Sequence, residues 1–165
     1  MDIASAYKNA MSKLASTVAV IANGRGEDRR GLAVSTFIPV SLDPEHPTIL
    51  FCVNDSSKTA AAINKNGTFC VNVLNDEHTR LAEVFAGKSS LTDGRKFDCG
   101  DWKDGVMPRL ANALVALDCS VVQSIRVGTH WIVVGEIIEF HLGEGSPLVY
   151  LNRNFLSLLG SDAAR

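Results

Sequence analysis

The hydrophobic positions along the chain follow a helical repeat near the N-terminus and strand-like repeats after it. Apolar residues at helical spacing predict an amphipathic helix over residues 2–14, formed by Ile3, Tyr7, Ala10, Met11 and Leu14. Short β-branched runs bounded by Gly, Pro and polar clusters predict strands at 17–22, 32–40, 47–54, 68–74, 113–127, 129–142 and 147–152. Two further helices are expected at 56–66 and 76–87, and a polar loop without periodicity at 88–112.

These elements do not alternate as strand–helix–strand units. Six or more strands with short turns and only three helices predict a mainly β fold, an antiparallel barrel or sandwich with flanking helices. The 165 residues contain no internal repeat, linker or low-complexity tract, so one domain spanning residues 1–165 is expected.

Composition and charge argue against several classes of function. Apolar residues make up 46% and charged residues 21%, as in an ordinary globular protein, and a net charge of -2 offers no basic surface for nucleic acid or an anionic membrane. No apolar run approaches the roughly 20 residues of a membrane span, and the N-terminal sequence lacks the pattern of a signal peptide. We therefore expect no nucleic-acid partner and no membrane partner.

The four cysteines and four histidines are dispersed along the chain. Metal or redox chemistry is one interpretation, but there is no CxxC pair and no histidine at ligand spacing, so we expect no metal site. Cys52 and Cys70 lie inside apolar runs and are expected to pack as small hydrophobic residues. This use of cysteine predicts a reduced, cytoplasmic protein.

The cluster N-D-S-S-K-T at 54–59 follows a run that is typical of a buried strand. Its hydroxyls and its lysine would lie in the first turn of the helix at 56–66, where free N–H groups and the helix dipole favour an anion such as a phosphate. Ser56 could equally be an ordinary N-cap, and Lys58 a solvated surface residue. Asp55 weakens the case for an anion.

The common nucleotide-binding turns are missing from the sequence. Gly24-Arg25-Gly26 is followed by no third glycine, and neither GxxxxGK[ST] nor GxSxG occurs. His130 lies at a predicted turn between two strands, where it could contact a ligand or simply be solvated. Tyr150, near the end of the last predicted strand, could contact a ligand or pack as a core aromatic.

Several segments, taken in order, resemble the short-chain flavin reductases, the reductase components of two-component flavin-dependent monooxygenases. The resemblance covers roughly residues 5–155 and is carried by STVAV, GLAVSTFIPVSLDP, LFCVNDSSKT, GTFCVNVL, FAG, a loop with RKF and a tryptophan, GTH, GEI and PLVY. The likeness is greatest to reductases that serve aromatic-ring hydroxylases such as 4-hydroxyphenylacetate 3-monooxygenase.

This resemblance implies a split β-barrel of the FMN-binding type, a Greek-key antiparallel barrel with flanking helices, in a homodimer. It implies NAD(P)H:flavin oxidoreduction, in which hydride passes from NADH or NADPH to N5 of FMN or FAD and the reduced flavin leaves to a separate oxygenase. A single domain of this length has no room for separate flavin and dinucleotide domains. The nicotinamide would therefore have to stack on the flavin itself.

The resemblance also assigns residues to the cofactors. The isoalloxazine would be lined by Val34, Ser35 and Thr36, with Ser41 and Asp43 in the turn nearby. The ribityl chain and phosphate would be held by Asn54, Ser56, Ser57, Lys58 and Thr59. The far end of the flavin would lie near Phe85, Ala86, Gly87 and Lys88. The nicotinamide nucleotide would meet His130, the catalytic candidate, together with Tyr150, Asn152 and Arg153.

Two departures from the family pattern leave details open. Glu45 and His46 stand where many relatives have a second proline, and the position of Asp55 is often basic. Two other functions also stay open: a flavoprotein reductase of a cobalt corrinoid or ferric chelate, and a non-catalytic flavin-binding module. A contact between His130 and nicotinamide would separate the enzymes from the binding module.

Overall fold

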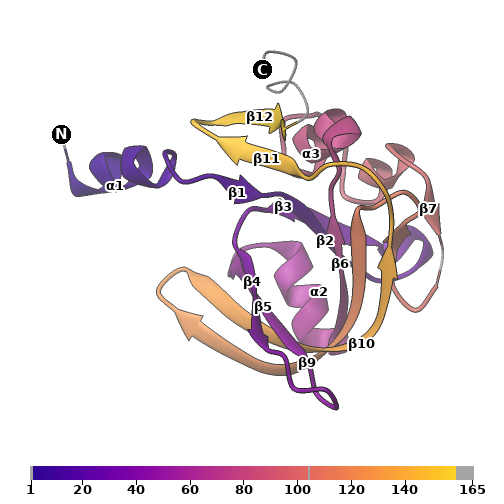
Figure 1. Cartoon of the computed structure of the whole chain (residues 1–165). Coiled ribbons are helices and arrows are strands. Elements are labelled where there is room, and N and C mark those ends of the chain that lie inside the picture. The colour runs from indigo at the N-terminus through magenta and orange to yellow at the C-terminus, as the bar shows by residue number, and fades with distance from the viewer. Residues whose placement is uncertain (1, 104, 159–165) are drawn as a thin grey trace.

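A seven-stranded antiparallel sheet forms the centre of the computed structural model, which describes residues 2–103 and 105–158. Its strand order is β3-β2-β6-β9-β10-β5-β4 (Figure 1). The strands are β2 (Ala19–Asn23), β3 (Arg30–Val34), β4 (Phe37–Ser41), β5 (Thr48–Asn54), β6 (Thr68–Val73), β9 (Val115–Val127) and β10 (His130–Leu142). The mainly β prediction is confirmed. Among the described residues no ladder joins the edge strands β3 and β4, so the sheet is open.

The run predicted as one strand at 32–40 is two strands. β3 ends at Val34 and β4 begins at Phe37, and the two lie at opposite edges of the strand order. The sheet therefore curls until the short connection Ser35–Thr36 can join its two edges. The carbonyl of Thr36 accepts a hydrogen bond of 3.2 Å from the N–H of Cys52, which holds this connection against β5.

β9 and β10 form the longest hairpin, and the predicted antiparallel pairing is confirmed. Gly128 turns the chain with a φ of +57°, a conformation that glycine adopts without a steric penalty. The register shifts between Val134 and Gly135 and again between Ile137 and Glu139. Such bulges add residues to one strand and change which side chains lie opposite each other.

The three α-helices of the described chain agree with the predicted ones. α2 (Lys58–Asn66) lies within the curve of the sheet and ends at Gly67, whose φ of +69° is left-handed (Figure 1). α3 (Thr79–Phe85) buries Leu81, Ala82, Val84 and Phe85 in a separate hydrophobic cluster. α1 (Ile3–Met11) extends away from the body and buries no residue within this chain (Figure 1).

The predicted loop at 88–112 contains more structure than its sequence indicates. It holds a 3-10 turn at Gly94–Asp98 and the short strands β7 (Trp102–Lys103) and β8 (Arg109–Leu110). Phe97 and Trp102 pack on Phe85 with ring centroids 5.1 and 5.4 Å away. A loop assignment was wrong here because two-residue strands are too short to show a hydrophobic period.

A third sheet completes the fold at the end of the described chain. β1 (Ser16–Thr17) pairs with β11 (Leu148–Leu151), which in turn pairs with β12 (Asn154–Ser157).

All four cysteines are free thiols. Burial, and secondarily the charge of Asp118, raises the pKa of the Cys119 thiol to about 12. The described part of the chain has no helix with the length and apolar character needed to cross a bilayer.

Candidate functional site

Residues of three separate sequence motifs meet around one cavity of about 150 Å³, which we call the Tyr150 cavity. Ser35 reaches it from the connection between β3 and β4, Ala86 and Lys88 from the end of α3, and Tyr150 from β11. The walls are lined by Val18, Ala33, Val34, Ser35, Ala86, Lys88, Tyr150 and Phe155. The motifs GLAVST, FAG and PLVY, far apart in sequence, thus form one mostly apolar pocket.

A second hollow of about 480 Å³, which we call the α1 groove, begins where the Tyr150 cavity ends. It is lined by Tyr7, Lys8, Met11, Ser12, Leu14, Ser16, Ser35, Tyr150 and Arg153. Ser35 and Tyr150 belong to both hollows. The two side chains therefore stand at the junction of a narrow apolar pocket and a wider, open groove.

The FAG segment contributes to the cavity through its later residues. Phe85 is 2% exposed and packs against other core aromatics, so its ring supports the wall from behind. Gly87, with a φ of +80°, ends α3 and turns the chain toward Lys88. The ammonium of Lys88 lies 5.2 Å from the centre of the Phe155 ring, which places a positive charge beside the pocket.

The cluster at 54–59 is a capped helix end, and the capping residue is Ser57. Its hydroxyl accepts a hydrogen bond of 3.2 Å from the N–H of Thr59. The alternative in which Ser56 caps the helix is wrong, because both its N–H and its hydroxyl donate to Oδ1 of Asn54, at 2.9 and 2.7 Å. These hydrogen bonds fix the backbone of the turn before α2.

Lys58 extends from the start of α2 toward a charged hollow that the sequence analysis did not identify. Its ammonium lies 3.4 Å from Oδ2 of Asp93, and the other carboxylate oxygen of Asp93 lies 3.5 Å from the ammonium of Lys96. Asp93 lines a hollow of about 520 Å³, the Asp93 hollow, together with Gly26, Glu27, Arg29, Arg30, Thr92, Gly94, Arg95 and Asp98. The charged run TDGRK at 92–96 could have indicated this hollow. The run alone does not indicate the pairing of Asp93 with Lys58, because Lys58 lies in α2.

Asp55 does not oppose an anion as strongly as its position in the sequence indicates. Its carboxylate accepts a hydrogen bond of 2.6 Å from the guanidinium of Arg126 on β9. Its N–H donates to the carbonyl of Thr129 at 3.0 Å. The negative charge is thus balanced by a residue 71 positions later in the chain. Asp55 and Arg126 together tie the tip of the long hairpin to the turn before α2.

His130 lies at the tip of the β9–β10 hairpin, beside this tie. It is exposed, its Nδ1 lies 3.0 Å from the hydroxyl of Thr129, and its backbone is opposite Asn54 in the pairing of β10 with β5. It lines neither the Tyr150 cavity nor the α1 groove. Within one chain, the structure places His130 near the phosphate candidates, whereas Tyr150 lies with the isoalloxazine candidates.

Asn152 and Arg153 form the two-residue turn between β11 and β12. Both have left-handed backbones, with φ of 49° and 66°, which matches a type I′ hairpin turn. The N–H of Asn152 donates to the carbonyl of Ser12 at 2.7 Å, which ties the hairpin to the segment after α1. Arg153 lines the α1 groove, so it can meet a ligand there.

Ser41 and Asp43 shape the turn between β4 and β5. The N–H of Asp43 donates to the Ser41 hydroxyl, and Asp43 Oδ1 accepts from the N–H groups of Glu45 and His46. These hydrogen bonds, first that of Glu45 and then that of His46, lower the pKa of the Asp43 carboxyl. The turn is therefore built by local hydrogen bonds of Ser41 and Asp43. A flavin contact by Ser41 or Asp43 stays a prediction.

Known proteins that are similar to this chain over most of its length are named as flavin reductases. The chain is 36% identical over 156 residues to the FMN reductase (NADH) RutF of Pantoea ananatis, covering 93% of this chain and 80% of that protein. It is 33% identical over 153 residues to the 4-hydroxyphenylacetate 3-monooxygenase reductase component of Pseudomonas aeruginosa, covering 91% and 89%.

A solved structure agrees over almost the whole chain. The NADH:FAD oxidoreductase SgcE6 of Streptomyces globisporus C-1027, in complex with NAD and FAD fragments, superimposes with a TM-score of 0.86 at 26% identity, covering 98% of this chain and 95% of that one. The family model described as "Flavin reductase like domain" matches residues 11–159. With the Tyr150 cavity formed by the motifs that carry the resemblance, the chain belongs to the flavin reductase like family.

Proposed function

We propose that this protein is an NAD(P)H:flavin oxidoreductase that supplies reduced FMN or FAD to a separate monooxygenase. The observation that carries the proposal is the placement of Ser35 and Tyr150 at the junction of two hollows, one narrow and apolar, the other open. The narrow pocket offers apolar walls to part of a flat ring, and the open groove leaves room for a second ring beside it. The names of the relatives support the same reaction and a partner oxygenase.

The described residues fit a flavin mononucleotide at two places, the ring and the phosphate. The hydroxyl of Ser35 and the backbone at 34–36 offer hydrogen bonds to a ring edge, next to apolar walls from Val34 and Ala86. The start of α2 offers free N–H groups and the ammonium of Lys58 to a phosphate. Bound flavin would supply the hydride acceptor. The side chains would orient the two rings and exclude water, and no side chain needs to give or take a proton in the transfer itself.

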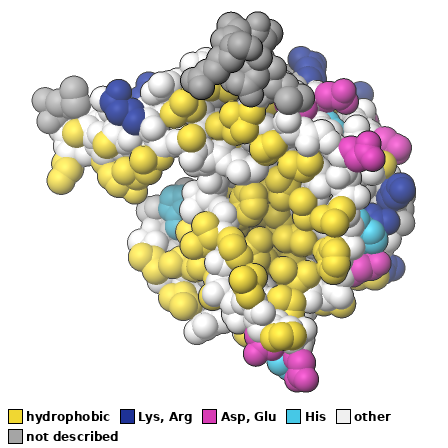
Figure 2. All heavy atoms as spheres, in the orientation of Figure 1, with side chains coloured by type: hydrophobic (Ala, Val, Ile, Leu, Met, Phe, Trp, Pro, Cys, Tyr) yellow, Lys and Arg dark blue, Asp and Glu magenta, His cyan; other side chains and the backbone are white. Residues whose placement is uncertain are grey.

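We further propose that the protein acts as a homodimer with a split-barrel fold. Large apolar side chains stay exposed on α1, β4 and the β9–β10 hairpin, and Figure 2 shows a broad apolar area on one face. A monomer rarely exposes so extensive a surface. Covering the hairpin would also bring His130 against a second copy, where it could meet a nicotinamide together with the other copy's hollows.

Steady-state oxidation of NADH and NADPH in the presence of FMN, FAD or riboflavin tests the proposed reaction. We expect flavin-dependent oxidation with at least one nucleotide. A protein that binds flavin without oxidising either nucleotide would be a binding module, and the reductase proposal would be overturned. His130→Ala should raise KM for the nucleotide and leave the Kd for flavin unchanged. An unchanged KM would remove His130 from the nucleotide site.

A further inference from the structure

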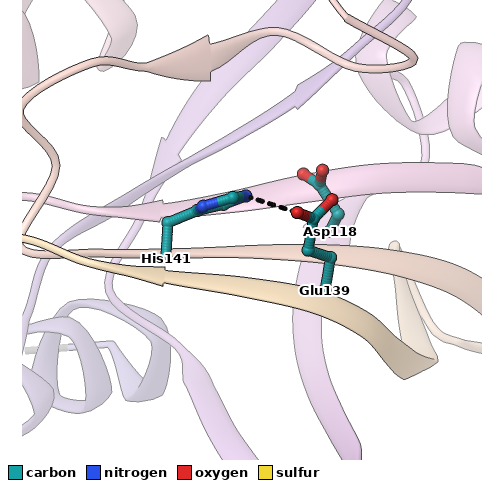
Figure 3. Close-up of side chains that lie close together, drawn as sticks. All are labelled: Asp118, Glu139 and His141. Atoms are coloured by element: carbon teal, nitrogen blue, oxygen red, sulfur yellow. Dashed lines mark ion pairs between the residues drawn. The ribbon is translucent and has the colours of Figure 1, made fainter.

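Three potential metal ligands lie together at the end of the long hairpin that is opposite to Gly128. Asp118 of β9 is paired with Glu139 of β10, and His141 lies two residues further along β10. Side chains two residues apart on a strand share a face, so Glu139 and His141 lie on the same side of the sheet as Asp118. Figure 3 shows the three side chains converging. We call them the Asp118 cluster.

The bulge before Glu139 creates this arrangement. Ile137 is opposite Cys119, whereas Glu139, two residues later, is opposite Asp118, so Ile138 is the extra residue. Without the extra residue, Ile138 would face Asp118 and the acidic and imidazole side chains would lie on the other face. One ligand atom from each residue lies within 4.8 Å of the others, a separation that a single ion can bridge.

A buried oxygen supplies a second, independent observation. Oδ1 of Asp118 is inaccessible to solvent and has no N–H or O–H donor among the described residues. A buried carboxylate oxygen without a donor is unfavourable, and a bound cation would compensate it. Cys70 is opposite Asp118 on β6, and its thiol, a weak donor, hydrogen-bonds the Asp118 carboxylate.

The cluster opens onto a cavity of about 250 Å³, so an ion and its waters have access. The opposite wall comes from residues 103, 105–107 and 109. From this wall, Nη1 of Arg109 comes within hydrogen-bond distance of Nε2 of His141. The same Nε2 lies 3.3 Å from Oε1 of Glu139, so Arg109 and Glu139 both contact the nitrogen that would bind a metal. Arg109 thus places a positive charge where an ion would bind, and an ion has to displace it.

We propose that Asp118, Glu139 and His141 bind a divalent first-row transition metal ion, with water completing its coordination. Two carboxylates and one imidazole suit such ions, whereas Mg²⁺ and Ca²⁺ prefer oxygen ligands alone. The ion would join β9 to β10 just beyond the bulge. None of the three residues lines the Tyr150 cavity or the α1 groove, so the ion would stabilise the hairpin rather than take part in flavin reduction.

Titration of the chelator-treated full chain with Co²⁺ tests the site, because Co²⁺ reports its ligands by absorption. We expect one equivalent to give weak visible bands without a thiolate charge-transfer band, and Zn²⁺ to raise Tm. His141→Ala and Asp118→Asn should each weaken Co²⁺ binding by about 100-fold or more, since even an outer-shell partner is worth roughly 10–100-fold. Thiolate absorption, or binding unaffected by both variants, would overturn the proposal.

Two controls separate metal binding from loss of structure. His46→Ala removes an exposed histidine whose Nδ1 lies 2.9 Å from Glu136, a residue of β10 outside the Asp118 cluster. This variant should leave Co²⁺ binding unchanged. Retained NADH:flavin activity in His141→Ala would show that the variant is folded. Arg109→Gln should bind Co²⁺ several-fold more tightly, because the competing charge is gone. Unchanged or weaker binding in Arg109→Gln would contradict the displacement on which the site depends.

Discussion

Replacing Lys58 with alanine should weaken the binding of phosphorylated flavins and spare riboflavin. The Lys58 side chain is 80% exposed and already pairs with Asp93 at 3.4 Å, so a phosphate gains only part of a charge-assisted hydrogen bond. Such bonds contribute about 1.5–3 kcal/mol when desolvated, and exposed ion pairs about 0–1 kcal/mol. We therefore expect a loss of about 1 kcal/mol, or roughly 5-fold in Kd for FMN.

The reverse change tests the same reasoning with the opposite sign. Asp93→Asn removes the carboxylate that competes with a phosphate for Lys58, so FMN should bind more tightly, by roughly 2–5-fold at low salt. Lys65→Ala, in the last turn of the same helix, is the matched control and should change neither Kd. Titration by flavin fluorescence at two salt concentrations measures all of these constants.

One outcome would refute the phosphate assignment directly. If Lys58→Ala weakened FMN, FAD and riboflavin equally, the lysine would act on the ring or on the fold, because riboflavin carries no phosphate. Tighter FMN binding in Lys58→Ala would place the phosphate elsewhere.

Three further predictions concern the backbone, pH and packing. Arg153→Gly should raise KM for the nucleotide and change Tm little. Glycine relieves the left-handed backbone of Arg153 by about 1 kcal/mol, and this gain offsets the loss of about 0.4–1 kcal/mol from the greater entropy of the unfolded chain. Burial lowers the pKa of His78 below its ordinary value of 6.5, so on acidification the unfolded chain takes up the proton at a higher pH than the folded chain does. The free energy of unfolding should therefore fall as the pH drops below 6.5, and His78→Gln should reduce this pH dependence. Gly135→Ala should cost about 1–3 kcal/mol, because the new Cβ would lie 2.4 Å from Cζ of the buried Phe69.

Each of these has a measurement that decides it. If Arg153→Gly leaves KM for the nucleotide unchanged, Arg153 does not contact the nucleotide in the α1 groove. Urea unfolding at several pH values contradicts the role of His78 if the wild type and His78→Gln have the same slope. Thermal unfolding of Gly135→Ala is compared with Gly94→Ala, where the nearest atom would be 3.5 Å from the new Cβ, and equal Tm values would contradict the predicted clash.

The elements that the sequence predicted correctly are those specified locally. The helix predicted at 56–66 has its N-cap inside that segment and Gly67 directly after it, and α2 spans Lys58–Asn66. The hairpin strands are long and alternate, and they pair as expected. The break at Ser35–Thr36 was missed because neither residue is a glycine or proline, and the apolar run continues on both sides. Its cause is that β4 pairs with β5 at the far edge of the sheet.

The same distinction separates the predictable part of the site from the rest. Ser56 donates to Asn54 and Thr59 donates to Ser57, all within residues 54–59, so a capped helix end could be predicted. The charges around it could not, because Asp55 is balanced by Arg126 and Lys58 is held by Asp93, residues from distant elements.

These two ion pairs act in opposite directions on the same helix end. Arg126 removes an obstacle to an anion, because it balances Asp55 at 2.6 Å, whereas Asp93 adds one, because it occupies Lys58. The pair at Lys58 is the more exposed, so a phosphate can replace the Asp93 carboxylate at little cost. If the phosphate binds at this helix end, as we propose, the affinity for phosphorylated flavin depends on these long-range partners. The motif at 54–59 would then specify where the phosphate lies, and the partners how tightly it is held.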